Sequence, residues 1–234
     1  MAHSRPTLNP MEILQALASA WNKLTLSPIF AAMQRGDMQS VESLVQRRKH
    51  LIATDEWGFT AFMIATRDGH TDLALKMLEL GASERHVSKA GATPLGVAAM
   101  AGDTRVGKAL LERGVDPNTA ETDPDGAYVS MTPLMWASNR RHPQFAELLS
   151  KAGADVNRVN GQNQTALMFA DDGTPDSNAV LEILLRARPN LQISDWRGRT
   201  IIDEAKARAK NSGRNEMRHL IAQHYPEFAN EMQA

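Results

Sequence analysis

The stretch "GATPLGVAAMAGDTRVGKALLERGV", residues 91–115, recurs in altered form along the chain. Related stretches are "GFTAFMIATRDGHTDLALKMLELGA" at 58–82, "SMTPLMWASNRRHPQFAELLSKAGA" at 130–154 and "NQTALMFADDGTPDSNAVLEILLRARP" at 163–189. Weaker copies begin near residues 29 and 198. One threonine recurs in the four clearer copies and in the weaker copy at 198, at spacings of 33, 39, 33 and 35 residues: Thr60, Thr93, Thr132, Thr165 and Thr200. Self-similarity at such a period is the signature of a repeat architecture.

Each copy divides into the same parts. A glycine-containing turn leads to a threonine that can cap a helix, followed in two copies by a proline suited to the first helical position. A short alanine-rich helix, a Gly-Asp or Gly-His break and a second helix follow, and a glycine at 81, 114 or 153 ends the unit. Helices this short are unstable alone, so the sequence predicts stacked copies that bury a continuous core.

The units resemble ankyrin repeats, whose 33-residue period and Thr-Pro-Leu-His-x-Ala pattern they follow. The resemblance covers residues 27–225 and implies an all-α ankyrin-repeat solenoid of about six repeats. The expected repeats are 27–54, 55–87, 88–118, 119–157, 158–192 and 193–225, with a segment 1–26 before them and a tail 226–234 after them. Segment 1–26 is expected to contain an amphipathic helix that Asn9 caps and Pro10 begins, with these residues on one face: Ile13, Leu14, Leu17, Trp21 and Leu24.

The chain departs from the family pattern in two ways. The position that is histidine in the pattern holds another residue in every copy, so the hydrogen bonds of that histidine are expected to be absent; the residues are Met63, Gly96, Met135, Met168 and Asp203. Two repeats also carry extra residues, in the turn at 119–130 and between the helices at 171–178. Insertions in a solenoid go to loops, often on the binding face.

Composition excludes several classes of function. The 234 residues contain no cysteine, which rules out disulfides and thiolate chemistry, and their formal charge is −1, which gives no general attraction to nucleic acid or membrane. No apolar run is long enough to predict a membrane span. A cytoplasmic location is expected, or a periplasmic or secreted one if a signal peptide was removed.

Candidate chemical sites are weak. Residues 121–126 begin like a calcium loop, with Glu121, Asp123 and Asp125, but Thr132 stands where the loop needs glutamate, so a solvated turn is favoured. No histidine spacing suits a metal, and no nucleophile elbow or phosphate-binding loop is present. The sequence therefore predicts no metal, no cofactor and no catalytic activity.

The resemblance implies a binding surface instead. In ankyrin proteins, the turns that project as fingers and the exposed side of the inner helices form the concave face, which binds partners. Four of the twelve aromatic residues fall at such positions, and aromatics and arginine are common binding hot spots. The predicted partner-binding residues are Trp57, Phe59, Lys89, Met100, Tyr128, Met131, Asn139, Arg140, Trp196, Arg197 and Arg199. Trp136, Met135 and Met168 are expected in the core.

The expected function is non-catalytic binding of another protein, by a monomer, as an inhibitor or immunity-type protein. The alternative is a regulatory or targeting subunit that recruits an enzyme without blocking it. Residues 186–218 hold nine Lys and Arg against four Asp and Glu. This local excess is interpreted as a solvated outer face with an end cap, or alternatively as a basic end of the concave face that meets an acidic partner.

Overall fold

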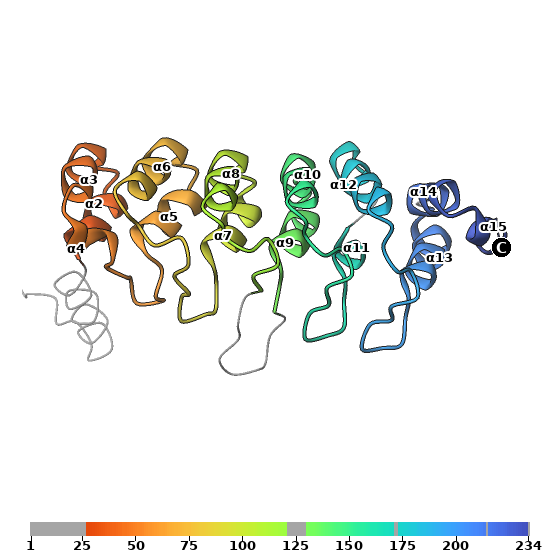
Figure 1. Cartoon of the computed structure of the whole chain (residues 1–234). Helices are drawn as coiled ribbons and strands as arrows, with labels where there is room; N and C mark the ends of the chain where they lie inside the picture. The colour runs from red at the N-terminus through yellow and green to blue at the C-terminus, as the bar shows by residue number, and fades with distance from the viewer. Residues whose placement is uncertain (1–26, 121–129, 171–172, 214, 234) are drawn as a thin grey trace, which may run out of the picture.

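The computed structural model of this chain describes residues 27–120, 130–170, 173–213 and 215–233. These residues form a row of helix pairs joined by long turns that all project from one side (Figure 1). The helices are α2 (Pro28–Gln34), α3 (Met38–Val45), α4 (Arg48–Leu51), α5 (Ala61–Arg67), α6 (Thr71–Glu79), α7 (Pro94–Ala101), α8 (Thr104–Glu112), α9 (Pro133–Asn139), α10 (Pro143–Lys151), α11 (Ala166–Phe169), α12 (Pro175–Arg186), α13 (Ile201–Ser212), α14 (Glu216–His224), the 3-10 helix η1 (Pro226–Phe228) and α15 (Ala229–Gln233).

Helices α2, α5, α7, α9, α11 and α13 form an inner layer next to the projecting turns, and α3, α6, α8, α10, α12 and α14 form an outer layer (Figure 1). Within the described ranges, β structure is limited to two isolated bridges, Thr54 with Thr60 and Ser194 with Thr200. The prediction of an all-α solenoid is confirmed. The predicted helix in 1–26 and the acidic turn at 121–126 lie outside the described residues.

The recurring threonines cap the inner helices. The Oγ1 atoms of Thr60, Thr93, Thr132 and Thr200 each accept a hydrogen bond from the backbone N–H three residues later, at 3.2–3.3 Å. Thr165 makes no such bond, and the α11 helix that follows it is only four residues long. The cap satisfies one of the N–H groups that a helix start leaves free, so its absence fits the shortness of α11.

The expectation that the histidine-type hydrogen bonds are absent throughout is wrong in two repeats. The Met135 sulfur lies 3.4 Å from the Thr132 backbone N–H and accepts a hydrogen bond from it. The Asp203 carboxylate accepts from the Thr200 N–H at 2.9 Å and from the Thr200 hydroxyl at 2.8 Å. Both positions therefore complete a capping box, because the residue at the third helical position reaches back to the cap.

Polar contacts also join neighbouring repeats in the outer layer. Asp103 caps α8 through the Val106 N–H at 3.1 Å, and its second oxygen accepts from the Thr71 hydroxyl at 2.7 Å. His142 lies at the start of α10, and its Nε2 is 3.3 Å from the Met100 carbonyl oxygen of the preceding repeat. These contacts fix the register between successive helix pairs, which the apolar core alone would leave less well defined.

The C-terminal end of the row is closed by buried contacts. The Tyr225 hydroxyl donates to the Pro189 carbonyl at 2.7 Å, and burial raises the pKa of this phenol. The Arg188 guanidinium stacks on the same ring, 5.0 Å from its centroid. Beyond it, η1 and α15 continue the chain and bury Met232. Part of the basic C-terminal third therefore serves to cap the last repeat.

Candidate functional site

The projecting turns, here called fingers, lie in the segments 52–60, 80–93, 113–132, 152–165 and 187–200 between successive helix pairs (Figure 1). Of the third segment, the structure describes residues 113–120 and 130–132. Three described fingers are shaped by the same device. The Oδ1 atom of Asp55 accepts from the backbone N–H groups two and four residues later, at 3.0 and 2.8 Å. Asn160 and Asp195 make the equivalent pairs of bonds at 2.8–2.9 Å. An Asx side chain that binds its own backbone in this way holds a turn in one conformation.

Neighbouring fingers are bonded to each other. The Lys89 backbone N–H donates to the Trp57 carbonyl at 3.0 Å, and the His86 Nε2 lies 2.7 Å from the Gly58 carbonyl oxygen. The last two fingers repeat the pattern, since the Trp196 N–H donates to the Gln162 carbonyl at 3.0 Å. These bonds use backbone atoms of both tryptophans, so the two indole rings are presented from turns that are already ordered.

The Asp195 side chain adds an ion pair to the two backbone hydrogen bonds that shape its finger. Its pKa is held below the usual range by the backbone N–H groups of Arg199 and Arg197 and by the Arg199 guanidinium, 3.1 Å away. A carboxyl whose pKa is lowered by folding stabilises the protein above its unfolded pKa, and the contribution disappears as the pH falls through the folded value.

Acid titration should therefore reveal Asp195. We expect the melting temperature to fall between about pH 5 and pH 2, and to fall less in the variant Asp195→Asn. Asparagine keeps the Oδ1 acceptor, as Asn160 shows in the preceding finger, so the variant should fold normally at pH 7. Thermal melts across this pH range test the expectation. An equally steep loss in both proteins would show that the carboxylate charge of Asp195 adds nothing to stability.

Most of the predicted binding residues lie exposed on this side of the molecule. The side chains of Trp57 and Trp196 are 64% and 60% exposed. The other exposed members of the predicted set are Lys89, Asn139, Arg140, Arg197 and Arg199. They come from the fingers and from the C-terminal ends of inner helices. The surface made of the fingers and the exposed side of the inner helices is here called the concave face.

The other four predicted binding residues are buried, partly buried or outside the described residues. Met131 is only 6% exposed and belongs to the core, which removes it from the candidate surface. Phe59 occupies the corresponding place before a capping threonine and also packs against the core, because this position points back onto the inner helices. Met100 is half-buried, and Tyr128 lies outside the described residues. Of the residues expected in the core, Met135 is fully buried, and Trp136 and Met168 pack against the core while partly exposed.

The exposed large apolar side chains of the described residues are confined to the fingers. They are Ile52, Trp57, Val87, Val159 and Trp196. Single exposed apolar residues are common on any surface, but their restriction to one kind of segment is informative. The outer helices present charged and polar side chains instead, several of them in ion pairs along one helix such as Lys151 with Glu147 and Arg186 with Glu182.

A hollow of about 280 Å³ opens beside Trp57 on the concave face. Its apolar lining comes from Phe30 and Met33 of α2 and from Ile64 of α5. The Arg67–Asp68 ion pair, with 2.8 Å between the Nε and Oδ1 atoms, forms part of its rim. An exposed indole over an apolar depression is the kind of place where a bulky apolar side chain of a partner can be buried.

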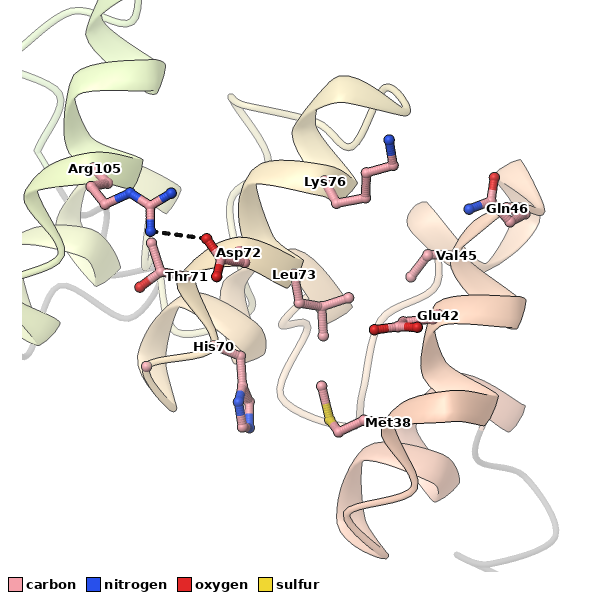
Figure 2. A pocket seen from close by; sticks show the side chains of 11 residues that line it. Met38, Glu42, Val45, Gln46, His70, Thr71, Asp72, Leu73, Lys76 and Arg105 are labelled. Carbon is pink, nitrogen blue, oxygen red and sulfur yellow. Dashed lines mark ion pairs between the residues drawn. The ribbon is translucent and has the colours of Figure 1, made fainter.

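A larger hollow of about 730 Å³ lies elsewhere, between the outer helices α3 and α6 (Figure 2). Figure 2 shows Met38, Glu42 and Val45 on one wall and His70, Leu73 and Lys76 on the other, with the Asp72–Arg105 ion pair at its far side at 2.9 Å. Its lining mixes apolar and polar side chains, as does that of the hollow beside Trp57. It differs in lying in the outer layer, away from the exposed tryptophans of the fingers.

Two guanidinium groups of the concave face stack on indole rings. The Arg140 guanidinium carbon lies 5.8 Å from the centroid of the Trp136 ring, and that of Arg197 lies 4.5 Å from the Trp196 ring. Arg199 differs, because it forms ion pairs with Asp195 and Glu204 at 3.1 and 3.3 Å. At 4.5 and 5.8 Å from a ring centroid, the guanidinium groups of Arg197 and Arg140 are attracted by the quadrupole of the ring.

Chemical features other than binding are scarce within the described ranges. They contain no cluster of three or more histidine, aspartate and glutamate side chains that could share a metal ion. No described helix combines the length and apolar character that a membrane span requires. What the described surface offers is a row of ordered turns that present aromatic and arginine side chains.

The residues that shape the fingers were not identified from the sequence. Asp55, Asn160 and Asp195 each stand five residues before one of the recurring threonines, Thr60, Thr165 and Thr200. Aligning the copies on that threonine would have placed them in one column, and the shared Asx chemistry was the available signal.

Comparison with known families agrees with this arrangement. A family model described as "Ankyrin repeats (3 copies)" matches residues 29–121 and 73–160. An ankyrin repeat domain from Acinetobacter baumannii AYE, solved by crystallography, superimposes with a TM-score of 0.69 at 28% identity, and the match covers 84% of this chain and 97% of that domain.

Two curated relatives are much longer proteins. Ankyrin repeat and KH domain-containing protein 1 of Homo sapiens is 33% identical over 106 residues, which are 45% of this chain and 4% of that protein. Inversin of Mus musculus is 30% identical over 192 residues, which are 81% of this chain and 17% of inversin. The chain thus spans a small part of the length of these relatives. The matches confirm the ankyrin repeat fold, and ankyrin repeats generally mediate protein–protein interaction.

Proposed function

Because this chain belongs to the ankyrin repeat family, we propose that it binds a folded partner protein through its concave face, with Trp57 and Trp196 as the main contacts. The observation that carries the proposal is the confinement of the exposed large apolar side chains of the described residues to the fingers. Exposing two tryptophan side chains by more than half to water is unfavourable. A partner that covers them removes this apolar surface from water, and the complex is stabilised.

The dimensions of the surface favour a folded domain as the partner. Four helix-to-helix steps separate α5, beside Trp57, from α13, beside Trp196, and adjacent packed helices lie about 8–10 Å apart. The two tryptophans are thus separated by roughly 30–40 Å, which is about the diameter of a small domain. One folded partner can contact both, and an interface of this length reaches the area of stable complexes.

Inhibition is the mode of action that we propose for this binding. A partner held along the whole row of fingers has a large part of its surface covered, and any active site in that part is closed to substrate. The expected result is that saturating amounts of the chain abolish the activity of the partner.

Recruitment without blocking is the second candidate, and the hollow between α3 and α6 favours it. This hollow lies in the outer layer, away from the fingers, so a second molecule could bind there while the concave face is occupied (Figure 2). A scaffold needs two separate surfaces of this kind, whereas an inhibitor needs only one.

Capture from the source cell tests the binding proposal. The chain is immobilised through its C-terminus, and the proteins retained by the wild type are compared with those retained by the variant Trp57→Ala/Trp196→Ala. The proposal expects a protein that the wild type retains and the variant loses. The activity of that purified protein is then measured with and without the chain: loss of activity supports inhibition, and unchanged activity supports recruitment. Equal retention by both proteins contradicts the use of the fingers.

A further inference from the structure

The two indole-stacked arginines lie in the C-terminal half of the concave face. Arg140 follows α9, and Arg197 lies at the tip of the finger that leads to α13. Both side chains are exposed, and neither forms an ion pair with a described carboxylate. By contrast, Arg199 and Arg208 share the carboxylate of Glu204.

Stacking prepares a guanidinium group to bind a carboxylate. The ring holds the plane of the group from one face, and the N–H donors stay at its edges, free to form two parallel hydrogen bonds. Much of the side-chain entropy that a free arginine would lose on binding has already been lost. Trp136 and Trp196 therefore act as positioning residues for Arg140 and Arg197.

The surroundings of these arginines carry more positive than negative charge. From Lys89 onward, the described residues of the fingers hold six Lys and Arg (Lys89, Arg113, Arg158, Arg188, Arg197 and Arg199) against three Asp (Asp116, Asp155 and Asp195). Asp195 is paired with Arg199, and α13 adds Asp203 and Glu204. Glu204 is neutralised by the two arginines that it binds. Asp171 and Asp172 lie outside the described residues. The N-terminal end differs, because Asp68 and Glu56 stand beside Trp57 there.

We propose that the C-terminal half of the concave face binds an acidic segment of the partner, with Arg140 and Arg197 each binding a carboxylate, an inference that rests on the protein-binding function proposed above. Along the row of inner helices, Arg140 and Arg197 are two steps apart, or at least roughly 16–20 Å at the usual packing distance. An extended segment needs at least about six residues, at about 3.3 Å each, to cover this span.

A protein ligand fits these observations better than a nucleic acid. Nucleic acid binding needs a basic track that follows a phosphate backbone, and the whole chain has a formal charge of −1. The concave face also places the apolar hollow of Trp57 on the same surface, which suits a protein that carries both apolar and acidic side chains.

The test uses a fluorescein-labelled oligoglutamate peptide of about ten residues, titrated with the full chain at about 20 mM and about 150 mM salt. We expect the double variant Arg140→Gln/Arg197→Gln to bind the peptide at least about tenfold more weakly than the wild type. The matched control Arg105→Gln/Lys151→Gln removes the same charge from the outer layer and should change the affinity less than about twofold.

A second variant separates geometry from charge. Arg197→Lys keeps the charge but loses the planar fork and its stacking on Trp196, so binding should weaken about threefold or more. A single-stranded oligonucleotide of equal charge should bind more weakly than the peptide. The inference is overturned if the peptide does not bind at low salt, or if the outer-layer control variant weakens peptide binding as much as Arg140→Gln/Arg197→Gln does. It is also overturned if Arg197→Lys binds the peptide as tightly as the wild type, or if the oligonucleotide binds the wild type as tightly as the peptide does. In each of these cases, loss of the captured partner in the Trp57→Ala/Trp196→Ala variant would still support the proposed function.

Discussion

Replacement of Gly107 by alanine should lower the free energy of unfolding by about 2 kcal/mol. Gly107 lies inside α8, where alanine is the better helix former by about 1 kcal/mol, so helix propensity predicts the opposite sign. Packing decides the outcome. A Cβ atom at Gly107 would stand 2.6 Å from the Cε2 and Cζ atoms of the Phe145 ring, and Phe145 is fully buried in the next repeat. The ring has no free space to move into, and overpacking of a dense core typically costs 1–3 kcal/mol.

Chemical denaturation of Gly107→Ala measures this effect. Gly161→Ala is the matched control, since nothing lies within 4 Å of its added Cβ atom, and it should change stability by less than about 0.5 kcal/mol. Adding Phe145→Leu to Gly107→Ala should recover part of the loss by making room for the methyl group. A Gly107→Ala protein more stable than the wild type would show that α8 and α10 are not packed as closely as described.

Replacement of Trp57 or Trp196 by alanine should weaken partner binding by roughly 2 kcal/mol or more, which is about thirtyfold in the dissociation constant. The fold should not respond, because each side chain is more than half exposed and the finger bonds use the backbone atoms of these residues. Surface substitutions of this kind move stability by less than about 0.5 kcal/mol.

Calorimetric titration of the purified partner measures the affinity, and circular dichroism with thermal melts confirms the fold. Arg47→Ala and Glu147→Ala serve as controls, since Arg47 precedes α4 and Glu147 lies on the outer helix α10. Affinity that survives both tryptophan changes but falls in the controls would move the binding surface to the outer layer.

The repeat pattern was sufficient to predict the fold, because its signals are local. Thr93 and Gly96 lie three residues apart, and the cap that joins them depends on nothing else in the chain. The exposure of Trp57 and Trp196 could also be predicted from the sequence. Both residues fall in the finger part of their repeat, and the fingers of every repeat project in the same way, so side chains at such positions face solvent.

What the sequence could not provide depends on contacts between repeats. The burial of Met131 follows from the packing of the finger onto the inner helices, and the clash expected at Gly107 follows from a ring 38 residues away in the chain. The hollow between α3 and α6 is likewise lined by side chains of two different repeats, among them Met38 and Glu42 from one and Lys76 from the other (Figure 2). The sequence pattern of one repeat contains no information about how that repeat packs against its neighbours.

Hydrogen exchange of the chain, measured alone and in complex with its partner, tests the use of the concave face most directly. Backbone amides of the fingers at 52–60, 80–93 and 187–200 should exchange more slowly in the complex, because the partner covers these turns. Amides of the outer helices α6, α8 and α10 should exchange at unchanged rates. Slower exchange confined to those outer helices, with the fingers unaffected, would contradict binding at the concave face.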